Sequence, residues 1–485
     1  MTCLITLRLR CFKSDVFSTL GMAAFAIFAA STPQIVSSAN LATKGQPTGT
    51  YGRLFAADSL WNSRPVEPVL GNDVIPKSDY FPNVAEGGWS TGLYLAKPGD
   101  PSVVVSGLPG KNGVWDVDAE ETHDVTVAHW PADLVPASEA DGHADIVDPV
   151  LGVVHSFWQL KKVDGRWIAS LYAWTPLNGR GWGDPSHYYQ GARAAAVPAA
   201  AGLMRRHEIN DGDAMYRHAL AISLTYNALS ANPTYVFPAT SADHDAATTN
   251  SGKIPEGTLL MLPPSFDAQK LATPELRKVA ETLKVYGAYV VDRNVGTPFA
   301  IYVELGSGFK LHKTGWNNAT AADLDGMREA LRPVLSTKGW LDANDRPFTP
   351  NRNLNLLSMR GPWTLKSGSG AGRFDTLRQA VVFNATDRVV QVNDTGRGLQ
   401  PVVWALPVPG RNYRLTSVTS GGGMLRITLR DKASSAVLFD SGDLADRAVK
   451  TFKWPSNAAI VVTATSGASG PSTVRGELVA VDDAR

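Results

Sequence analysis

Cysteine is nearly absent from this sequence. Its 485 residues include only two cysteines, Cys3 and Cys11, and both lie near the start of the chain. The rest of the chain therefore has no thiol nucleophile, no disulfide and no cysteine-ligated metal. A chain of this length can instead draw its stability from a large packed core, and two domains are the natural expectation.

Long apolar runs are also missing. The longest, at positions 16–30, is shorter than the roughly 20 apolar residues that a membrane-spanning helix needs. It follows a basic leader containing Arg8 and Arg10 and precedes small residues up to Ala39, which is the order of a secretory signal. We predict a signal peptide at 1–39, a secreted or periplasmic mature protein, and no membrane span after signal removal. A retained N-terminal anchor is the alternative.

The sequence also lacks an excess of either positive or negative charge. Charged residues make up 19% of the chain, and the formal net charge is +1, which becomes about −1 without the leader. The sequence contains no basic cluster. This balance argues against nucleic acid as a partner, and it leaves the oligomeric state open.

Several signature motifs of cofactor enzymes are absent. The nine histidines form no zinc motif, and the chain has no GxSxG, GxxxxGK[ST] or GxGxxG segment. We predict no metal and no cofactor, although His143 and Asp145 leave a metal site open as an alternative. The chemistry left to the chain is acid and base catalysis by carboxylates, His, Tyr and Arg.

Glycine, proline and tryptophan, by contrast, are plentiful. The chain has 44 Gly, 31 Pro and 13 Trp, a composition typical of β architectures with many loops. We predict a mainly β protein, either like a β-sandwich or jelly roll or mixed β with a few packed helices. A β-rich putative catalytic domain spans 50–363. After a flexible linker at 366–373, a C-terminal antiparallel β-sandwich at 373–485 serves as an accessory domain.

Periodicity predicts several elements inside the larger domain. Apolar spacing and capping residues indicate helices over 192–208, 274–287 and 321–335. Alternation predicts a strand over 215–224, and two strands within 288–305 are expected to pair as a hairpin.

The stretch 141–160, DGHADIVDPVLGVVHSFWQL, predicts two strands joined by a turn at 148–152. Alternation places His143 and Asp145 on one face of the first strand. Polar groups at core-facing positions are costly unless they have partners, so they mark either a satisfied structural network or an active cleft.

Glycoside hydrolysis is one reaction that fits the available groups, because it needs two carboxyls flanking the bond. Asp141, Asp145 and Asp292 are candidates, since each lies in or beside an apolar strand where burial raises a pKa. In this version Asp141 and Asp292 are the pair, and His143 orients or tunes one of them. The acidic run WDVDAEETHD at 115–124 is interpreted as a solvated turn.

β-Elimination from a uronate polymer is the alternative reaction. His143 or His218 would be the base, and Arg193 or Arg217 would neutralise the uronate carboxylate. A histidine held in a satisfied core network is the other interpretation of His218.

Aromatic residues suggest where a sugar could stack. The loop NGRGWGDPSHYYQG and its surroundings are predicted to expose rings that bind substrate, although ordinary packing under a long loop is the alternative. The predicted substrate-binding residues are Trp158, Trp182, Tyr188, Tyr189, Arg193 and Arg217.

Several segments together resemble a family of secreted bacterial proteins. They are DGHADIVDP followed by HSFW, RHALAISL, YVFPAT, IPEGTLLMLPPSFD and LKVYGAYVVDR. The resemblance covers roughly 58–304, does not reach the C-terminal sandwich and implies no particular activity. Family members often carry a glutamate where this chain has His155–Trp158, which puts any mechanism needing that glutamate in doubt. The resemblance marks four side chains as family-pattern positions: Asp141, His143, His218 and Asp292.

These observations predict a secreted carbohydrate-active enzyme that cleaves glycosidic bonds of an extracellular polysaccharide, with hydrolysis favoured over elimination by a lyase. A non-catalytic carbohydrate-binding envelope protein is the competing class, because it would keep the aromatic loop without needing the ionisable groups to converge.

Overall fold

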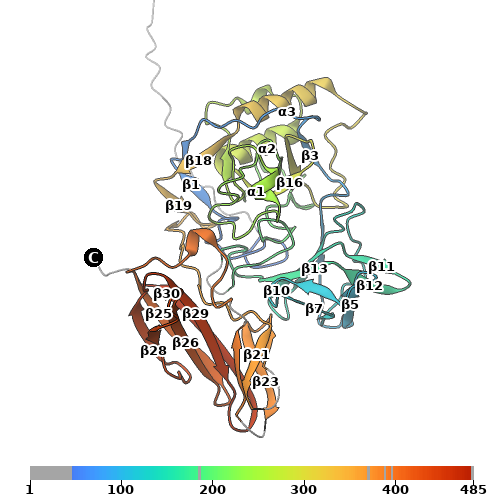
Figure 1. Ribbon diagram of the computed structural model, residues 1–485. Helices are drawn as coiled ribbons and strands as arrows, with labels where there is room; N and C mark the ends of the chain where they lie inside the picture. The colour runs from blue at the N-terminus through green and yellow to red at the C-terminus, as the bar shows by residue number, and fades with distance from the viewer. Residues whose placement is uncertain (1–45, 184–186, 369–371, 387–388, 395–396, 482–485) are drawn as a thin grey trace, which may run out of the picture. The chain divides into compact units, whose positions relative to one another are not determined.

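The computed structural model shows a chain built mainly from β-strands (Figure 1). The predicted signal peptide and the middle of the predicted linker lie outside the described residues. The structure describes residues 46–183, 187–368, 372–386, 389–394 and 397–481.

The described part of the chain contains three α-helices, and two short 3-10 turns accompany them. The mainly β prediction is therefore confirmed. Within these residues no helix is long and apolar enough to cross a membrane. The helical elements are α1 (Ala246–Thr249), α2 (Pro274–Val285), α3 (Asn318–Ala330), η1 (Ala268–Lys270) and η2 (Val403–Ala405).

The stretch 141–160 folds as predicted, into two antiparallel strands of a six-stranded sheet. β9 pairs with β10 so that Ser156 lies opposite Asp145. In sheet order the strands are β4 (Gly92–Leu95), β9 (Ala144–Asp148), β10 (Val153–Trp158), β13 (Leu171–Pro176), β6 (Val114–Asp116) and β7 (Glu121–His123). A neighbouring four-stranded sheet has the order β11 (Lys161–Val163), β12 (Arg166–Ala169), β5 (Val103–Gly107) and β8 (Val125–Val127).

A seven-stranded sheet forms the second framework of the larger domain. Its order is β2 (Val69–Leu70), β18 (Arg332–Ser336), β15 (Leu259–Met261), β16 (Ala288–Asn294), β14 (Leu220–Thr225), β17 (Phe299–Tyr302) and β3 (Asn83–Ala85). The predicted hairpin within 288–305 is wrong, because β14 lies between β16 and β17 and pairs with both. The strand predicted over 215–224 begins only at Leu220.

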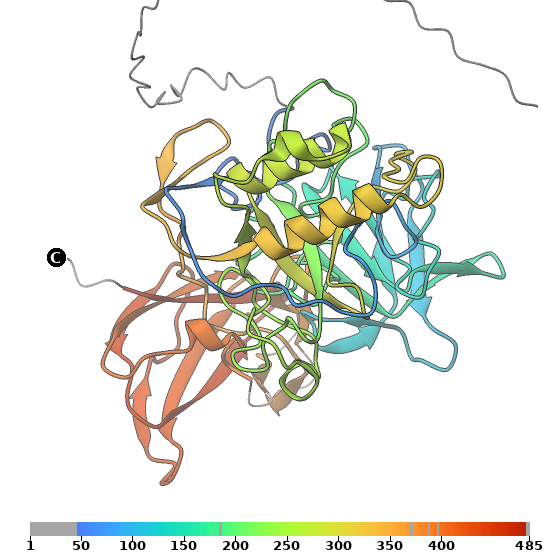
Figure 2. The ribbon, with the colours of Figure 1, turned by 90° about the horizontal axis from the view of Figure 1, so that it is seen from above.

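Helix α2 confirms its prediction closely. The Thr273 side chain caps it by accepting a hydrogen bond from the Leu276 N–H at 3.2 Å, and Pro274 occupies the first turn. Its buried face and that of α3 share one apolar core with the seven-stranded sheet, and Figure 2 shows the two helices running beside each other. Helix α3 ends earlier than predicted, because the chain turns into β18, which contains Pro333.

The helix predicted over 192–208 is wrong. This segment consists of turns whose backbone groups bind neighbouring strands, as in the bond from the Ala195 N–H to the Val291 carbonyl at 3.1 Å. The helical pattern is interrupted by Pro198 and by Gly202. The φ angle of Gly202 is +64°. The spacing of its small residues therefore reflects close packing against strands.

The C-terminal part is an antiparallel sandwich of two five-stranded sheets, as predicted. One has the order β21 (Trp363–Ser367), β24 (Gln391–Asp394), β29 (Ala458–Thr465), β26 (Met424–Asp431) and β27 (Val437–Asp440). The other has the order β22 (Arg373–Asp375), β23 (Ala380–Thr386), β30 (Gly470–Ala480), β25 (Asn412–Ser420) and β28 (Val449–Lys453). A small sheet of β1 (Arg64–Val66), β19 (Gly339–Leu341) and β20 (Pro347–Phe348) completes the list of strands. The domain boundaries themselves stay a prediction.

Candidate functional site

Asp145 on β9 is a structural carboxyl. It is fully buried, and its two oxygens accept hydrogen bonds from the Ser156 hydroxyl and the Ala200 N–H, each at 2.5 Å. Burial raises its pKa to about 6, although both hydrogen bonds act in the opposite direction. These bonds fasten the turn segment around Ala200 to the six-stranded sheet, which is the satisfied network considered in the sequence analysis.

His143, just before β9, is held as a neutral imidazole. Its side chain is buried, and Nδ1 lies 3.3 Å from the Phe157 carbonyl oxygen. Since a carbonyl only accepts, Nδ1 carries the proton and Nε2 is left as an acceptor. Burial, reinforced by the positive charge of Arg193, lowers the pKa of His143 well below its usual value.

Arg193 is the cation around which the predicted residues gather. Its side chain is 1% exposed, Nη1 donates to the Asp292 carboxylate at 3.0 Å, and the guanidinium lies 3.7 Å above the Tyr302 ring. The backbone holds it in place, because the Arg193 N–H donates to the Val197 carbonyl at 3.0 Å. Nε and Nη2 have no hydrogen-bond partner among the described residues. A buried guanidinium of this kind positions its partners and cannot itself meet a substrate.

Asp292 lies on β16 and keeps contact with solvent. A bulge between Ile222 and Ser223 of β14 shifts the register, so Asp292 lies opposite Ser223. The Asp292 side chain is 18% exposed. Burial raises its pKa to about 6, Arg193 opposes the shift, and the charges of Asp243 and Asp141 add to it. Asp292 can therefore hold a proton up to a pH of about 6 while it is reachable from solvent.

Asp141 joins this cluster from the turn before β9. Its carboxylate accepts a hydrogen bond from the Trp158 indole N–H at 3.0 Å, and both side chains are partly exposed. The negative charge of Asp141 raises the pKa values of Arg193, Asp292 and Tyr302, although burial and nearer groups have larger effects on each. Asp292 therefore pairs with Arg193 directly, and His143 and Asp141 interact with the same cation electrostatically.

Two further carboxyls belong to the cluster and were missed in the sequence analysis. Glu256 is fully buried, and burial together with the charges of Asp243 and Asp292 raises its pKa well above the usual value. One Glu256 oxygen accepts from the Asp243 N–H at 3.3 Å. Asp243, whose pKa is raised by burial, lies 3.9 Å from an Arg293 nitrogen. Glu256 precedes the apolar strand β15, the same signal that selected Asp292.

His218 and Arg217 lie in a different polar group. Nε2 of His218 is 3.1 Å from the Glu208 carboxylate, and its Nδ1 lies 2.9 Å from the Ala219 carbonyl. Arg217 pairs with Asp213 at 2.9 Å. Neither interacts with the cluster around Arg193 in any contact of the described residues, so the structure separates them from Asp141, His143 and Asp292.

The aromatic loop does not expose its rings as expected. Trp182 is 2% exposed and stacks on Trp61 with ring centroids 4.8 Å apart. Tyr188 is buried as well, and Tyr189 and Trp158 are only partly exposed. The polar, glycine-rich composition thus reflects a loop packed over the core. Of these aromatic residues, Trp158 is the one fixed to a carboxylate of the cluster.

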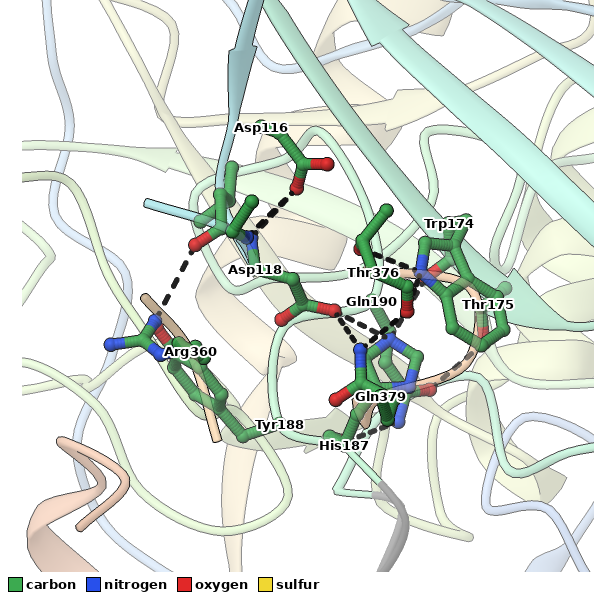
Figure 3. A network of polar contacts seen from close by, with 12 residues as sticks. Asp116, Asp118, Trp174, Thr175, His187, Tyr188, Gln190, Arg360, Thr376 and Gln379 are labelled. Carbon is green, nitrogen blue, oxygen red and sulfur yellow. Dashed lines mark hydrogen bonds and ion pairs between the residues drawn. The ribbon is translucent and has the colours of Figure 1, made fainter. Parts of the chain in front are cut away.

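The interpretation of the acidic run as a solvated turn is wrong. Asp116 and Asp118 are buried, and Oδ1 of Asp116 accepts the Asp118 N–H at 3.0 Å (Figure 3). Oδ2 of Asp118 accepts from the Gln379 amide at 2.8 Å and lies 3.5 Å from Nε2 of His187. Burial raises the pKa of Asp118 to about 6, and the neighbouring Asp116 adds to this.

This second set of contacts, the Asp118 network, ties four chain segments together. The Arg360 guanidinium donates to the Tyr188 hydroxyl, to the Glu120 carboxylate and to the Val117 carbonyl. Figure 3 shows Arg360 and Gln379 meeting the loop that carries His187 and Tyr188. Because Asp118, His187 and Arg360 are buried and contact groups of distant segments, we regard the Asp118 network as structural, although Oδ1 of Asp118 and Nδ1 of His187 have no hydrogen-bond partner among the described residues.

The described residues contain no group of three or more His, Cys, Asp or Glu side chains arranged to hold a metal ion. Of the carboxyls around Arg193, Asp292 pairs with Arg193 and Asp243 lies near Arg293.

No family model matches this chain, and no curated protein matches it in sequence. The resemblance to a family of secreted bacterial proteins therefore stays a prediction.

Local likenesses to solved structures are slight. Accessory secretory protein 1, 2 and 3 of Streptococcus pneumoniae is 13% identical over 21% of this chain and 86% of that chain, with a TM-score of 0.15. The CBM1 of BiXyn10A is 13% identical over 25% of this chain and 81% of its own, with a TM-score of 0.17. The enzymatically active domain of tailspike protein 4 from bacteriophage CBA120 is 13% identical over 24% of this chain and 19% of its own, with a TM-score of 0.15. TM-scores this low carry no argument about fold or activity.

Proposed function

We propose that the protein is a secreted or periplasmic enzyme that hydrolyses glycosidic bonds in an extracellular polysaccharide. The single observation that carries the proposal is Asp292, a partly exposed carboxyl whose pKa is raised to about 6 beside a buried arginine and further carboxyls. A proton donor with a raised pKa next to an ionised carboxylate is what acid-catalysed glycoside cleavage requires.

In the proposed mechanism Asp292 gives its proton to the glycosidic oxygen as the bond to the leaving sugar breaks. The Asp141 carboxylate, oriented by the Trp158 N–H, takes a proton from a water that adds to the anomeric carbon. The developing positive charge on the sugar ring is stabilised by the surrounding carboxylates. Arg193 fixes the orientation of Asp292. Asp141 then releases its proton to solvent, and Asp292 takes up a proton from solvent for the next turnover.

Elimination by a lyase is less well supported. Arg193 is buried and paired with Asp292, so it is not placed to meet a uronate carboxylate. Burial lowers the pKa of His143, which makes its imidazole a weak base, and raises the pKa of Tyr302. His218 is paired with Glu208 outside the cluster. A non-catalytic binding protein would have no need for a partly exposed carboxyl of raised pKa beside further carboxyls, an arrangement that is costly to fold.

The test is a screen of the purified protein on neutral and uronate polysaccharides. We expect new reducing ends without the ultraviolet absorbance of an unsaturated uronate product. Asp292→Asn should lower the rate by about 100-fold or more, because general acid catalysis contributes on that order. Asp133→Asn is the matched control, since Asp133 is exposed and lies outside the cluster.

An unsaturated product would favour the lyase instead. Cleavage by Asp292→Asn at the wild-type rate would remove Asp292 from the mechanism, and no cleavage of any polymer would favour the binding protein.

A further inference from the structure

Two cavities share part of their lining, and among the described residues neither is lined by Asp292, Arg193 or Glu256. The first has a volume of about 530 Å³ and lies between the segment 349–356 and residues of the C-terminal sandwich. The second, of about 500 Å³, lies against β18, β19 and the segment 236–238. Thr349, Pro350 and Arg352 line both cavities. We call the pair the 352 groove.

The charge of the 352 groove is positive. Arg352 and Arg411 line the first cavity, and Lys338 and Arg352 line the second. Among the described residues, neither lining includes a carboxylate, although Lys338 also pairs with Glu67 at its rim. A small hollow of about 30 Å³ beside them adds Arg180 and one carboxylate, Asp58. In a protein whose net charge is near zero, this is a local concentration of cations.

Aromatic rings line both cavities, with Trp404 in the first and Phe237 in the second. Phe237 meets Trp404 edge to face, with ring centroids 5.1 Å apart, and the Arg352 guanidinium lies 4.8 Å from the centre of the Phe237 ring. The Trp404 N–H donates to the Ala239 carbonyl at 2.7 Å, which fixes the ring in place. Trp340 and Phe348 line the second cavity. Rings held rigidly beside guanidinium groups present flat apolar faces and charged donors to the same ligand.

We propose that the 352 groove binds an anionic stretch of a polysaccharide, through carboxylate or sulfate groups on its sugars. Arginine donates two parallel hydrogen bonds to such groups, and sugar rings pack against aromatic faces. This inference rests on the proposed function and adds to it that the substrate is acidic. The acidic cluster around Arg193 repels an anionic chain, so a separate cationic groove supplies the attraction that retains it.

The test measures binding of hexagalacturonate and of its fully methyl-esterified, uncharged form by titration calorimetry. The full-length Asp292→Asn variant is used beside wild type, so binding is measured whether or not the protein cleaves. We expect the charged hexamer to bind at least about tenfold more tightly than the neutral one, with an affinity that falls as salt is added. A sulfated hexasaccharide of a neutral sugar distinguishes sulfate from carboxylate as the preferred anion.

Arg352→Glu and Arg411→Glu should each weaken binding of the charged hexamer by about tenfold or more. Arg447→Glu is the matched control, because Arg447 is 92% exposed and lies outside both cavities. Equal binding of charged and neutral hexamers, unchanged binding by both groove variants, or equally tight binding of a thymidine hexanucleotide would overturn the inference. A protein that binds the charged hexamer but cleaves no polymer would not overturn the inference, because binding is measured separately from cleavage.

Discussion

Asp292 and Arg193 illustrate how one carboxyl is tuned by opposing influences. Burial and the charges of Asp243 and Asp141 favour the protonated acid, whereas Arg193 favours the carboxylate, and the pKa of about 6 is the result. A general acid must be protonated to act, so activity should fall as the pH rises through this value.

Replacing Arg193 with methionine should move this decline to higher pH. Without the guanidinium, the pKa of Asp292 rises, so the acid stays protonated over a wider range and the high-pH limb of the rate profile shifts upward by about one unit or more. The profile is measured on the polysaccharide that wild type cleaves. Maximal activity should fall as well, because the orientation of Asp292 is lost.

Arg193→Lys serves as the comparison, because it keeps the positive charge but loses the planar donor geometry. We expect the high-pH limb of its rate profile to stay near that of wild type, whereas its maximal rate declines. A limb that moves equally in both variants would show that the charge of Arg193 does not set the pKa of Asp292.

Which side chains could be found from sequence depended on their local surroundings. Asp141, His143 and Asp292 flank apolar strands, and that signal is visible in sequence. Asp118 and Asp243 gain their properties from segments far away in the chain, such as that of Gln379 for Asp118. Sequence periodicity carries no information on such contacts, so the Asp118 network was mistaken for a solvated turn.

Helices and strands, too, were predictable where their signals are local and not where they depend on distant contacts. Helix α2 was predictable because its cap, its apolar face and its first-turn proline are all local signals. The pairing of β16 and β17 was not, because alternation identifies a strand but not its neighbour in the sheet. The segment 192–208 was misassigned because alanine favours helices, whereas its backbone hydrogen bonds go to strands.

Two glycine-to-alanine changes should shift the free energy of unfolding in opposite directions. A Cβ on Gly191 would lie 1.9 Å from the Pro198 nitrogen, so the turns that hold Arg193 could not keep their backbone conformation. We expect Gly191→Ala to lower the free energy of unfolding by about 2 kcal/mol or more and to reduce activity. A Cβ on Gly326 in α3 meets no atom within 4 Å, so Gly326→Ala should raise the free energy by about 1 kcal/mol.

Urea unfolding followed by circular dichroism measures both changes. Wild-type stability in Gly191→Ala would contradict the close approach of the 191 and 197–198 backbones. A loss of activity in Gly326→Ala would show that substitutions outside the cluster also affect the assay.

Across the molecule, the Asp118 network makes stability depend on pH. In the folded chain the pKa of Asp118 is about 6, because burial outweighs the nearby His187 and Arg360 and the Gln379 hydrogen bond. Unfolding returns the carboxyl to its usual pKa near 4, so the folded state binds more protons between those values. Stability from this group is therefore greatest at low pH and is lost as the pH rises from about 4 to about 6.

Asp118→Asn removes this dependence, because the amide does not ionise and its oxygen can still accept from Gln379. Relative to wild type, the variant should gain stability as the pH rises from 4 to 7, by up to about 3 kcal/mol. Urea unfolding of both proteins at several pH values measures the difference. Glu208, whose pKa is lowered to about 2, has the opposite dependence at lower pH in both proteins, so the comparison isolates Asp118. A constant difference across the range would contradict this account.

The insertion of β14 between β16 and β17 also sets a time order for synthesis. Asp141 and Arg193 leave the ribosome long before Asp292, and β14 remains without either sheet neighbour until residues 288–302 have followed. Such distant pairings form late and slowly. Asp292, Asp141 and the Arg193 guanidinium can therefore meet only after more than half of the chain has been made, so under the proposed function a prematurely stopped chain would lack its acid.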